Sequence, residues 1–252
     1  MIIRGERLHI GKDKKHSFVL EHIQRYRFAA KWANKRTVLD LGCGEGYGTK
    51  ILKRAGASKI IGVDINKEVI KQAKKNYSSK SVFFQEGDAQ GLEFKDKSFD
   101  LVISLELIEH LQNYKKYLKE VKRVLKTKGV FILSTPNKDN YRGESSPFHV
   151  KEFSLEELRE TLTGLFQKVE IFGQQITNPQ IADSERYFFN LYQRLTFGRS
   201  LTKKLFLLIP SEIKAFFYKN LFGQTPQAMK SDFKISKRKL SEAITFLVLC
   251  QK

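Results

Sequence analysis

The stretch of this chain best equipped for chemistry is "SLELIEHL", residues 104–111, which sets two carboxylates and an imidazole among aliphatic residues. Glu106, Glu109 and His110 stand at positions i, i+3 and i+4, a spacing that puts side chains on one face if the segment is helical. Such a triplet suits a metal site, an acid–base group or the polar rim of a fold. Its role therefore depends on the elements that position it.

Six β-rich runs between residues 36 and 173 alternate with helical patterns. The runs are TVLDL, KIIGVD, SVFFQ, FDLVIS, GVFILST and KVEIFG. Between them, residues 114–125 set apolar side chains at helical spacing opposite lysines, and Ser154 with Glu157 forms a capping box that predicts another helix. This alternation predicts an α/β domain, a doubly wound Rossmann-like parallel sheet with helices on both faces.

The rest of the chain flanks this core, which we assign to residues 36–173. Residues 1–35 predict a loop followed by a helix. Residues 174–240 predict a basic, aromatic helical insertion or lid, because residues 184–240 hold 12 Lys or Arg and three acids. Residues 241–252 return to strand character and predict a final strand of the same sheet.

The composition sets limits on the class of protein. The chain has 252 residues with 46 Lys and Arg against 27 Asp and Glu, a net charge of +19, which fits a polyanionic partner or an anionic membrane. Much of the excess positive charge lies along predicted helical faces, which favours a solvated surface over a binding surface for a polyanion. With no apolar run of membrane-spanning length and two isolated cysteines, we expect a cytoplasmic protein without redox chemistry.

The most specific motif is "VLDLGCGEGYGT", residues 38–49, in which a predicted strand runs into three glycines. They are Gly42, Gly44 and Gly46. Glycine is needed where a backbone turns sharply or must approach a ligand closely. A dinucleotide-binding loop would show G-x-G-x-x-G, but Tyr47 and Thr49 occupy the positions of its third glycine. A hydride-transfer cofactor is therefore the weaker interpretation.

Acidic residues end three successive predicted strands. They are Asp40, Asp64 and Asp88. Open α/β sheets bind ligands at the carboxyl ends of their strands. Asp64 follows Gly46 by 18 residues, close to the distance at which an acid reaches ribose hydroxyls in nucleotide-binding folds. Three carboxylates favour a cofactor with an ammonium, a ribose and an adenine amino group over one with phosphates.

The order of these motifs resembles that of the class I S-adenosylmethionine-dependent methyltransferases over at least residues 20–173. The motifs are VLDLGCGEGYGT, GVDI, EGDAQGLEF, FDLVISLELIEHL and RVLKTKGVFILSTPN. The resemblance implies S-adenosylmethionine as cofactor and a seven-stranded sheet whose last strand is antiparallel. It also implies the residues at the cofactor, which are Asp40, Gly42, Cys43, Gly44, Gly46, Tyr47, Asp64, Ile65, Asp88, Ala89, Leu105 and Glu106.

Segments that flank these motifs resemble particular subgroups of the family. "GERL", "EHIQRYRFAAKW", "STPN" and "PFHVKEFSLEEL" resemble a bacterial and archaeal subgroup linked to surface glycan biosynthesis, which implies O-methylation of a small-molecule or glycan-precursor hydroxyl. "ELIEH" also resembles quinone-biosynthesis O-methyltransferases and small-RNA 2′-O-methyltransferases. The RNA group holds a divalent ion with two glutamates and two histidines. By that resemblance the ligands here are Glu106, Glu109, His110 and His149.

Several alternatives stay open at this point. Glu109, His110 and His149 are expected at the reaction centre as ion ligands, as a metal-free acid–base group, or as structural residues. The chain is expected to act on a small-molecule or glycan acceptor, with peripheral membrane contact through residues 184–222. The alternative functions are an RNA methyltransferase, a nucleic-acid-binding protein that uses the basic insertion, and a cofactor-binding module without catalysis.

Overall fold

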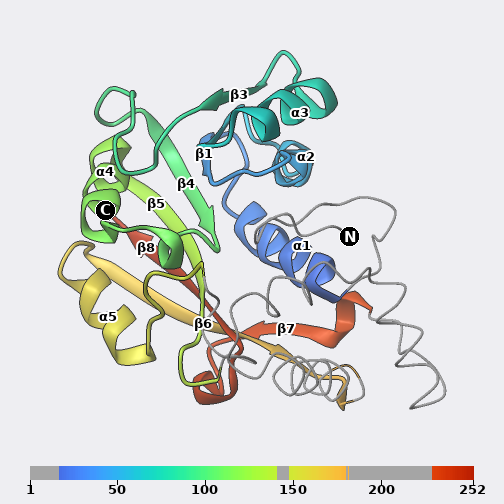
Figure 1. The fold of residues 1–252 in the computed structure, drawn as a ribbon, viewed down its shortest axis with the longest axis vertical. Helices are drawn as coiled ribbons and strands as arrows, with labels where there is room; N and C mark the ends of the chain where they lie inside the picture. The colour runs from blue at the N-terminus through green and yellow to red at the C-terminus, as the bar shows by residue number, and fades with distance from the viewer. Residues whose placement is uncertain (1–16, 141–147, 180, 182–228) are drawn as a thin grey trace.

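The β-rich runs form one mixed sheet in the computed structural model, which describes residues 17–140, 148–179, 181 and 229–252 (Figure 1). Within these residues the sheet has eight strands in the order β3-β2-β1-β4-β5-β8-β6-β7. The strands are β1 (Thr37–Leu41), β2 (Lys59–Asp64), β3 (Val82–Glu86), β4 (Phe99–Leu105), β5 (Leu125–Pro136), β6 (Lys168–Ile176), β7 (Phe233–Ser236) and β8 (Thr245–Gln251). Strands β1 to β5 are parallel, and β8 pairs with both β5 and β6 in the antiparallel sense.

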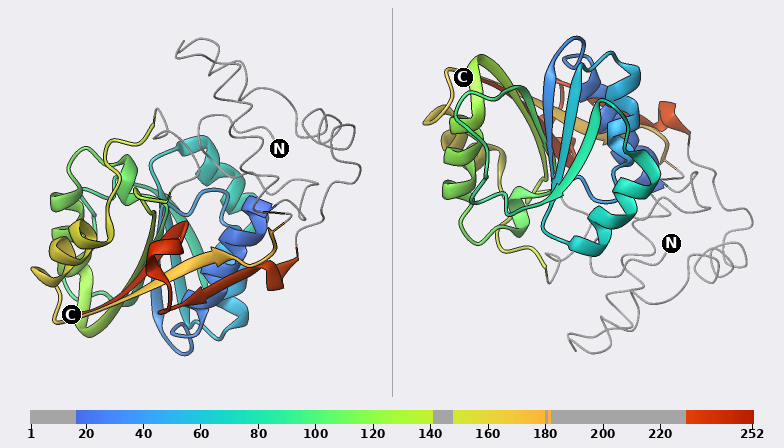
Figure 2. Two further views of the ribbon diagram at one scale, coloured as in Figure 1. Left: turned by 90° about the horizontal axis from the view of Figure 1, so that it is seen from below. Right: turned by 90° about the horizontal axis from the view of Figure 1, so that it is seen from above.

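Helices cover both faces of the sheet (Figure 2). One face carries α1 (Ser17–Ala30), α2 (Tyr47–Arg54) and α3 (Lys67–Tyr77), and the other carries α4 (Tyr114–Val124) and α5 (Leu155–Thr163). Three short 3₁₀ turns are also described: η1 (Ile108–His110), η2 (Lys230–Asp232) and η3 (Leu240–Glu242). The arrangement places the ends of β1 to β4 and the turn η1 along one edge.

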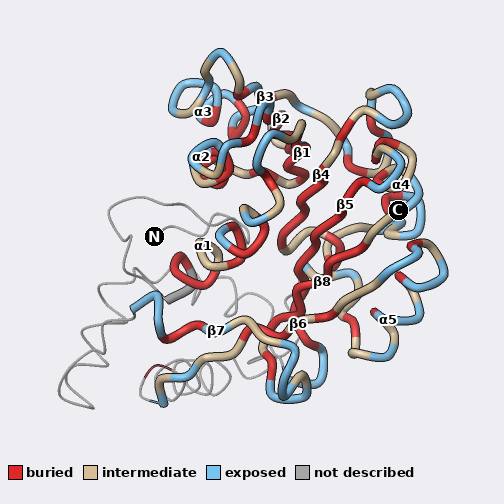
Figure 3. Tube along the Cα trace, turned by 180° about the vertical axis from the view of Figure 1, so that it is seen from behind, coloured by how far each residue is buried: buried red, intermediate tan, exposed pale blue. Residues whose placement is uncertain are grey.

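The apolar core has two layers because successive strand residues point to opposite faces. Leu39 and Val102 pack in one cluster with Tyr117 of α4, whereas Val38 and Leu101 pack in another with residues of α1 and α2. The central strands are the most continuously buried segments in Figure 3. Burial on both faces explains why these strands appear in the sequence as unbroken apolar runs.

The predicted fold is confirmed. All six predicted core strands form, β8 is the expected antiparallel strand, and α5 begins with the predicted capping box at Ser154 and Glu157. The sheet differs in one respect, since it has an eighth strand, β7, which pairs with the end of β6. Both β7 and the last residues of β6 lie within residues 174–240, for which the sequence pattern predicts only an insertion.

Most of that insertion lies outside the residues that the structure describes. Residues 182–228, and with them the membrane-contact stretch 184–222, lie outside the described residues. The expectations of nucleic-acid or membrane contact through this region therefore stay predictions. Among the helices that the structure describes, none is long and apolar enough to cross a membrane.

Candidate functional site

The glycine loop between β1 and α2 is built on left-handed backbone. Gly42, Gly44 and Gly46 have φ angles of +70°, +53° and +83°, in a region that residues other than glycine rarely adopt. A Cβ atom on Gly46 would lie 2.7 Å from the ring of Phe84, whereas one on Gly44 would meet nothing within 4 Å. Gly46 is therefore required for packing, and Gly44 borders open space that a ligand can enter.

The next two strand ends lie beside this loop. Asp64, at the end of β2, accepts a hydrogen bond from the Gly44 amide at 3.1 Å, and the neighbouring Ile65 is 64% exposed. Asp88 follows β3 with an exposed side chain, and the side chain of Ala89 is buried. An open glycine loop flanked by two strand-end carboxylates suits the ammonium, ribose and adenine groups of S-adenosylmethionine.

Asp40 occupies a different environment from the other two acids. Its side chain is fully buried, and the Tyr26 hydroxyl lies 3.1 Å from both carboxylate oxygens. Burial raises the pKa of Asp40 to about 7. Cys43 and Tyr47 are also buried, and the Tyr47 hydroxyl hydrogen-bonds His22 Nδ1. These three predicted cofactor residues therefore direct their side chains into the protein beneath the loop.

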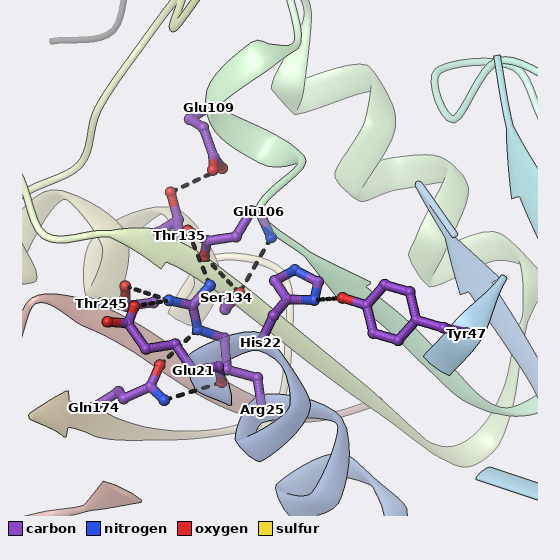
Figure 4. Close-up of polar contacts among 10 residues, drawn as sticks. All are labelled: Glu21, His22, Arg25, Tyr47, Glu106, Glu109, Ser134, Thr135, Gln174 and Thr245. Atoms are coloured by element: carbon purple, nitrogen blue, oxygen red, sulfur yellow. Dashed lines mark hydrogen bonds and ion pairs between the residues drawn. The ribbon is translucent and has the colours of Figure 1, made fainter. Parts of the chain in front are cut away.

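Arg25 of α1 is the centre of a buried polar network (Figure 4). Its Nη1 lies 3.2 Å from Glu106 Oε2, and Nη2 lies 3.3 Å from Glu21 Oε2. Its Nε donates to Gln174 of β6 at 2.6 Å, and Nη2 also donates to Thr245 of β8 at 3.1 Å. Our sequence interpretation missed this network, because Arg25 and Thr245 are 220 residues apart and no local pattern joins them.

The chain turns sharply at Glu106, directly after β4. Glu106 has φ +54°, its amide donates to the Ser134 carbonyl oxygen at 3.1 Å, and its Oε1 accepts from the Ser134 hydroxyl at 2.7 Å. The next residue, Leu107, packs against Gly42 of the glycine loop. This left-handed turn prevents Glu106 from sharing a helical face with Glu109 and His110, which belong to the separate turn η1. Neither of those two caps α4, which begins at Tyr114 with Asn113 as its N-cap.

Glu109, His110 and His149 form a second group, here called the imidazole cluster. A ligand atom from each lies within 4.8 Å of the others. Glu109 is fully buried: its Oε2 accepts from the Thr135 hydroxyl at 3.1 Å, and its Oε1 has no hydrogen-bond partner. Burial raises the pKa of Glu109 well above its ordinary value, and the charge of Glu106 raises it further. The predicted trio is thus brought together, but Glu106, the fourth predicted ligand, lies outside this group.

The histidines of the cluster are held by one loop segment. His110 Nδ1 lies 3.1 Å from the Phe148 carbonyl oxygen, and the two imidazole centroids are 4.9 Å apart. His149 Nδ1 lies 2.7 Å from Oε1 of Glu152. Glu152 was absent from our sequence interpretation, although its position three residues after His149 was a local signal that could have identified it.

Comparisons with known proteins identify the family of the chain. A family model described as a methyltransferase domain matches residues 39–133, which run from β1 into β5. A protein of Mycolicibacterium smegmatis named as a probable S-adenosylmethionine-dependent methyltransferase is 32% identical over 176 residues, or 68% of this chain and 67% of that relative. The mitochondrial ubiquinone biosynthesis O-methyltransferase of Dictyostelium discoideum is 35% identical over 113 residues, or 40% of this chain and 35% of that relative. The matches thus span about two thirds or less of these relatives.

A solved structure shows the same fold. The S-adenosylmethionine-dependent methyltransferase from Archaeoglobus fulgidus aligns with a TM-score of 0.59 at 20% identity, and the alignment covers 93% of each chain. Fold likeness alone leaves activity undefined, but the glycine loop, the strand-end carboxylates and the M. smegmatis relative all agree with the motif order. The chain belongs to the class I S-adenosylmethionine-dependent methyltransferases.

Proposed function

We propose that this protein transfers the methyl group of S-adenosylmethionine to a hydroxyl oxygen of a small molecule or glycan precursor. The observation that supports the proposal is the imidazole cluster, which lies beside the turn after β4. A hydroxyl acceptor must lose a proton as its oxygen is methylated, and a positioned imidazole can take that proton. The D. discoideum relative, named as an O-methyltransferase, supports the same class of acceptor.

Bound S-adenosylmethionine supplies an activated methyl group: the acceptor oxygen bonds to the methyl carbon, the carbon–sulfur bond breaks, and sulfur keeps the electron pair. The chain contributes binding and proton transfer. We assign the binding of ribose and adenine to Asp64 and Asp88. The acceptor's proton passes to the imidazole cluster. A carbonyl or carboxylate oxygen faces Nδ1 of His110 and of His149, so Nε2 is the proton-accepting nitrogen of each ring.

As the alternative use of the same Nε2 atoms, we propose that the imidazole cluster holds a divalent ion, which would take the place of the imidazoles in activating the hydroxyl. Its three potential ligand atoms lie within 4.8 Å of one another, and Glu109 Oε1 is buried without a partner. Two imidazoles and one carboxylate suit Mn²⁺, Fe²⁺ or Zn²⁺, and metal-bound histidines usually donate their other nitrogen to an oxygen, as both rings do here. Such an ion would lower the pKa of a bound hydroxyl.

Cofactor binding and product analysis test the proposed reaction. Calorimetry should show S-adenosylmethionine binding that Asp64→Ala weakens by about 10- to 100-fold, the loss expected for hydrogen bonds to a charged group. Asp100→Ala is the control, because Asp100 lies on β4 and binds Lys126. Mass spectrometry of products from phenolic and sugar acceptors should locate the methyl group on oxygen. Methylation only at nitrogen or carbon would contradict the proposal.

Chelation tests the ion. Treatment with a chelator should abolish turnover, and Mn²⁺ should restore it. Glu109→Gln and His110→Ala should each weaken the binding of Mn²⁺, followed by its electron paramagnetic resonance signal, without changing the affinity for S-adenosylmethionine. Turnover that is insensitive to chelator would rule out the ion and leave the imidazoles as the proton acceptors.

A further inference from the structure

We propose that Glu152 is a positioning residue that fixes His149 as the Nδ1–H tautomer and thereby makes Nε2 the nitrogen that takes part in the reaction. The inference rests on the proposed function for its catalytic meaning, because that function assigns a proton-accepting or ion-binding nitrogen to His149. The tautomer itself does not depend on the acceptor. It can therefore be measured separately from turnover.

The contact between the two side chains defines the tautomer. His149 Nδ1 lies 2.7 Å from Glu152 Oε1, and the side chains are 5% and 11% exposed. An ionised carboxylate only accepts hydrogen bonds, so the proton of a neutral imidazole must be on Nδ1. Charge-assisted bonds of this length are stronger than neutral ones, and the low exposure limits competition from water. The second ring nitrogen, Nε2, consequently carries no proton and keeps its lone pair.

The backbone around the pair is anchored on both sides. The amides of Val150 and Lys151 donate to the Glu109 carbonyl oxygen at 2.7 and 3.1 Å, which ties the segment to η1. Phe153 is fully buried and forms a β-bridge with Asn137. The segment that carries Glu152 is thus fixed relative to the imidazole cluster. A rotation of the His149 ring would break its bond to Glu152, so the carboxylate determines the ring's orientation.

The second imidazole of the cluster repeats the pattern. His110 Nδ1 faces the Phe148 carbonyl oxygen at 3.1 Å, so a backbone oxygen of the same segment selects the same tautomer. Hydrogen-bond acceptors on one loop, the Phe148 carbonyl and the Glu152 carboxylate, therefore orient both rings. Exposed ion pairs contribute little to stability, but this pair is nearly buried and joins a ring already assigned to the reaction. A positioning role accounts for both features.

Nuclear magnetic resonance of the full chain labelled with ¹⁵N at histidine tests the tautomer directly. In metal-free protein at about pH 8, where an ordinary imidazole is neutral, His149 should show the Nδ1–H pattern; His149→Gln identifies its signals among the five histidines. Glu152→Ala should add the Nε2–H form. The proposal is overturned if His149 is Nε2–H in the wild type, or if Glu152→Ala leaves its tautomer unchanged.

Kinetics test whether the tautomer matters for turnover. Glu152→Gln should lower kcat by about 10- to 100-fold, as removal of a partner that orients a histidine typically does, with unchanged affinity for S-adenosylmethionine and partial recovery in Glu152→Asp. Glu157→Gln is the matched control. Glu157 lies five residues further along, caps α5 and binds Lys151, and a capping box accepts glutamine as well as glutamate.

The outcomes separate this inference from the proposed function. A wild type that methylates no hydroxyl while Glu152→Ala changes the His149 tautomer would reject the proposed reaction and support the positioning contact. A wild type that methylates a hydroxyl while Glu152→Gln is as active as Glu157→Gln would support the reaction and reject the role of Glu152.

Discussion

The polar residues of the "ELIEH" segment have distinct surroundings although they are neighbours in sequence. The positive φ of Glu106 directs its carboxylate toward Arg25 and Ser134. Glu109 points into the protein toward Thr135, and His110 contacts the loop that carries His149. Spacing alone implied one shared face. Because Glu106 has left-handed backbone, its carboxylate is anchored apart from Glu109 and His110, which belong to the cluster suited to proton transfer.

Arg25 should contribute strongly to stability. Arg25→Met retains much of the side-chain volume but leaves the buried Glu21 and the neighbouring Glu106 without their cation. Removal of one partner from a buried ion pair typically costs about 3–5 kcal/mol, and we expect about 3 kcal/mol here because Glu106 is partly exposed. Urea unfolding measures the loss. Arg27→Met, on the exposed side of the same helix, should cost less than about 0.5 kcal/mol; equal losses would contradict the role of Arg25.

Two glycines of the loop should respond differently to alanine. Gly46→Ala combines a left-handed backbone with a Cβ atom 2.7 Å from Phe84, so it should lower the free energy of unfolding by more than the roughly 1 kcal/mol of backbone strain alone. Gly44→Ala meets no protein atom, so it should lose little more than that strain while weakening S-adenosylmethionine binding. Denaturation and calorimetry measure the two quantities. Gly91→Ala is the control, since Gly91 has neither constraint.

At the level of single residues, the sequence predicted the positions of those residues that belong to local motifs. The placement of Gly44, Asp64 and Asp88 follows from strand ends, and His149 was expected near His110 because it follows the fifth strand. Arg25 could not be predicted, because three of its partners come from other segments that only the folded sheet brings together. Asp40 matched the motif, yet its burial against Tyr26 depends on where α1 packs.

At the level of elements, the strands were predictable because burial on both faces requires continuous apolar runs. Strand β7 was not, since its four residues include Lys234 and only Phe233 is buried. Its pairing with β6 supplies backbone partners that the side chains do not indicate. The short turn η1 was likewise hidden, because its residues have the spacing of an α-helix but follow a left-handed residue.

The capping box of α5 provides a test at this level. Ser154 accepts from the Glu157 amide at 3.2 Å, and Glu157 accepts from the Ser154 amide at 2.9 Å. Ser154→Ala should lower the free energy of unfolding by about 1 kcal/mol. Chemical denaturation of this variant and of Thr163→Ala, at the other end of the helix, provides the comparison. The proposal for the cap fails if both variants lose the same stability.

At the level of the whole molecule, buried titratable groups make stability depend on pH in opposite directions. Asp40 has a pKa raised to about 7 by burial, so the folded state keeps its proton where the unfolded state loses it. Its contribution therefore decreases as pH rises from about 4 to 7. Desolvation, aided by Arg25, lowers the pKa of His22 to about 3. That imidazole contributes stability above about pH 6.5, which is lost as pH falls.

Asp40→Asn should isolate the first contribution. Asparagine cannot titrate but can still accept from the Tyr26 hydroxyl, so the variant's free energy of unfolding should fall less than that of the wild type between pH 4 and 7. The difference between the two falls should be at most about 4 kcal/mol. Urea titrations at fixed ionic strength measure the difference. Asp100→Asn is the control: hydrogen bonds from Thr37 and Lys126 outweigh desolvation and lower the pKa of Asp100, so its effect on stability falls below about pH 4 and this variant should follow the wild type between pH 4 and 7. Parallel curves for the wild type and Asp40→Asn would contradict the assignment.

Helix α1 has a further consequence for protein engineering. Through Arg25 it joins Glu106, beside the parallel strands, to Gln174 and Thr245 on the antiparallel strands. The region that matches the family model, residues 39–133, contains the motifs but neither α1 nor β6 and β8. The motif-bearing segment is therefore not a portable cassette: a chimera that transplants it into another host must supply an arginine from outside the segment, or Glu106 would have no buried counter-ion.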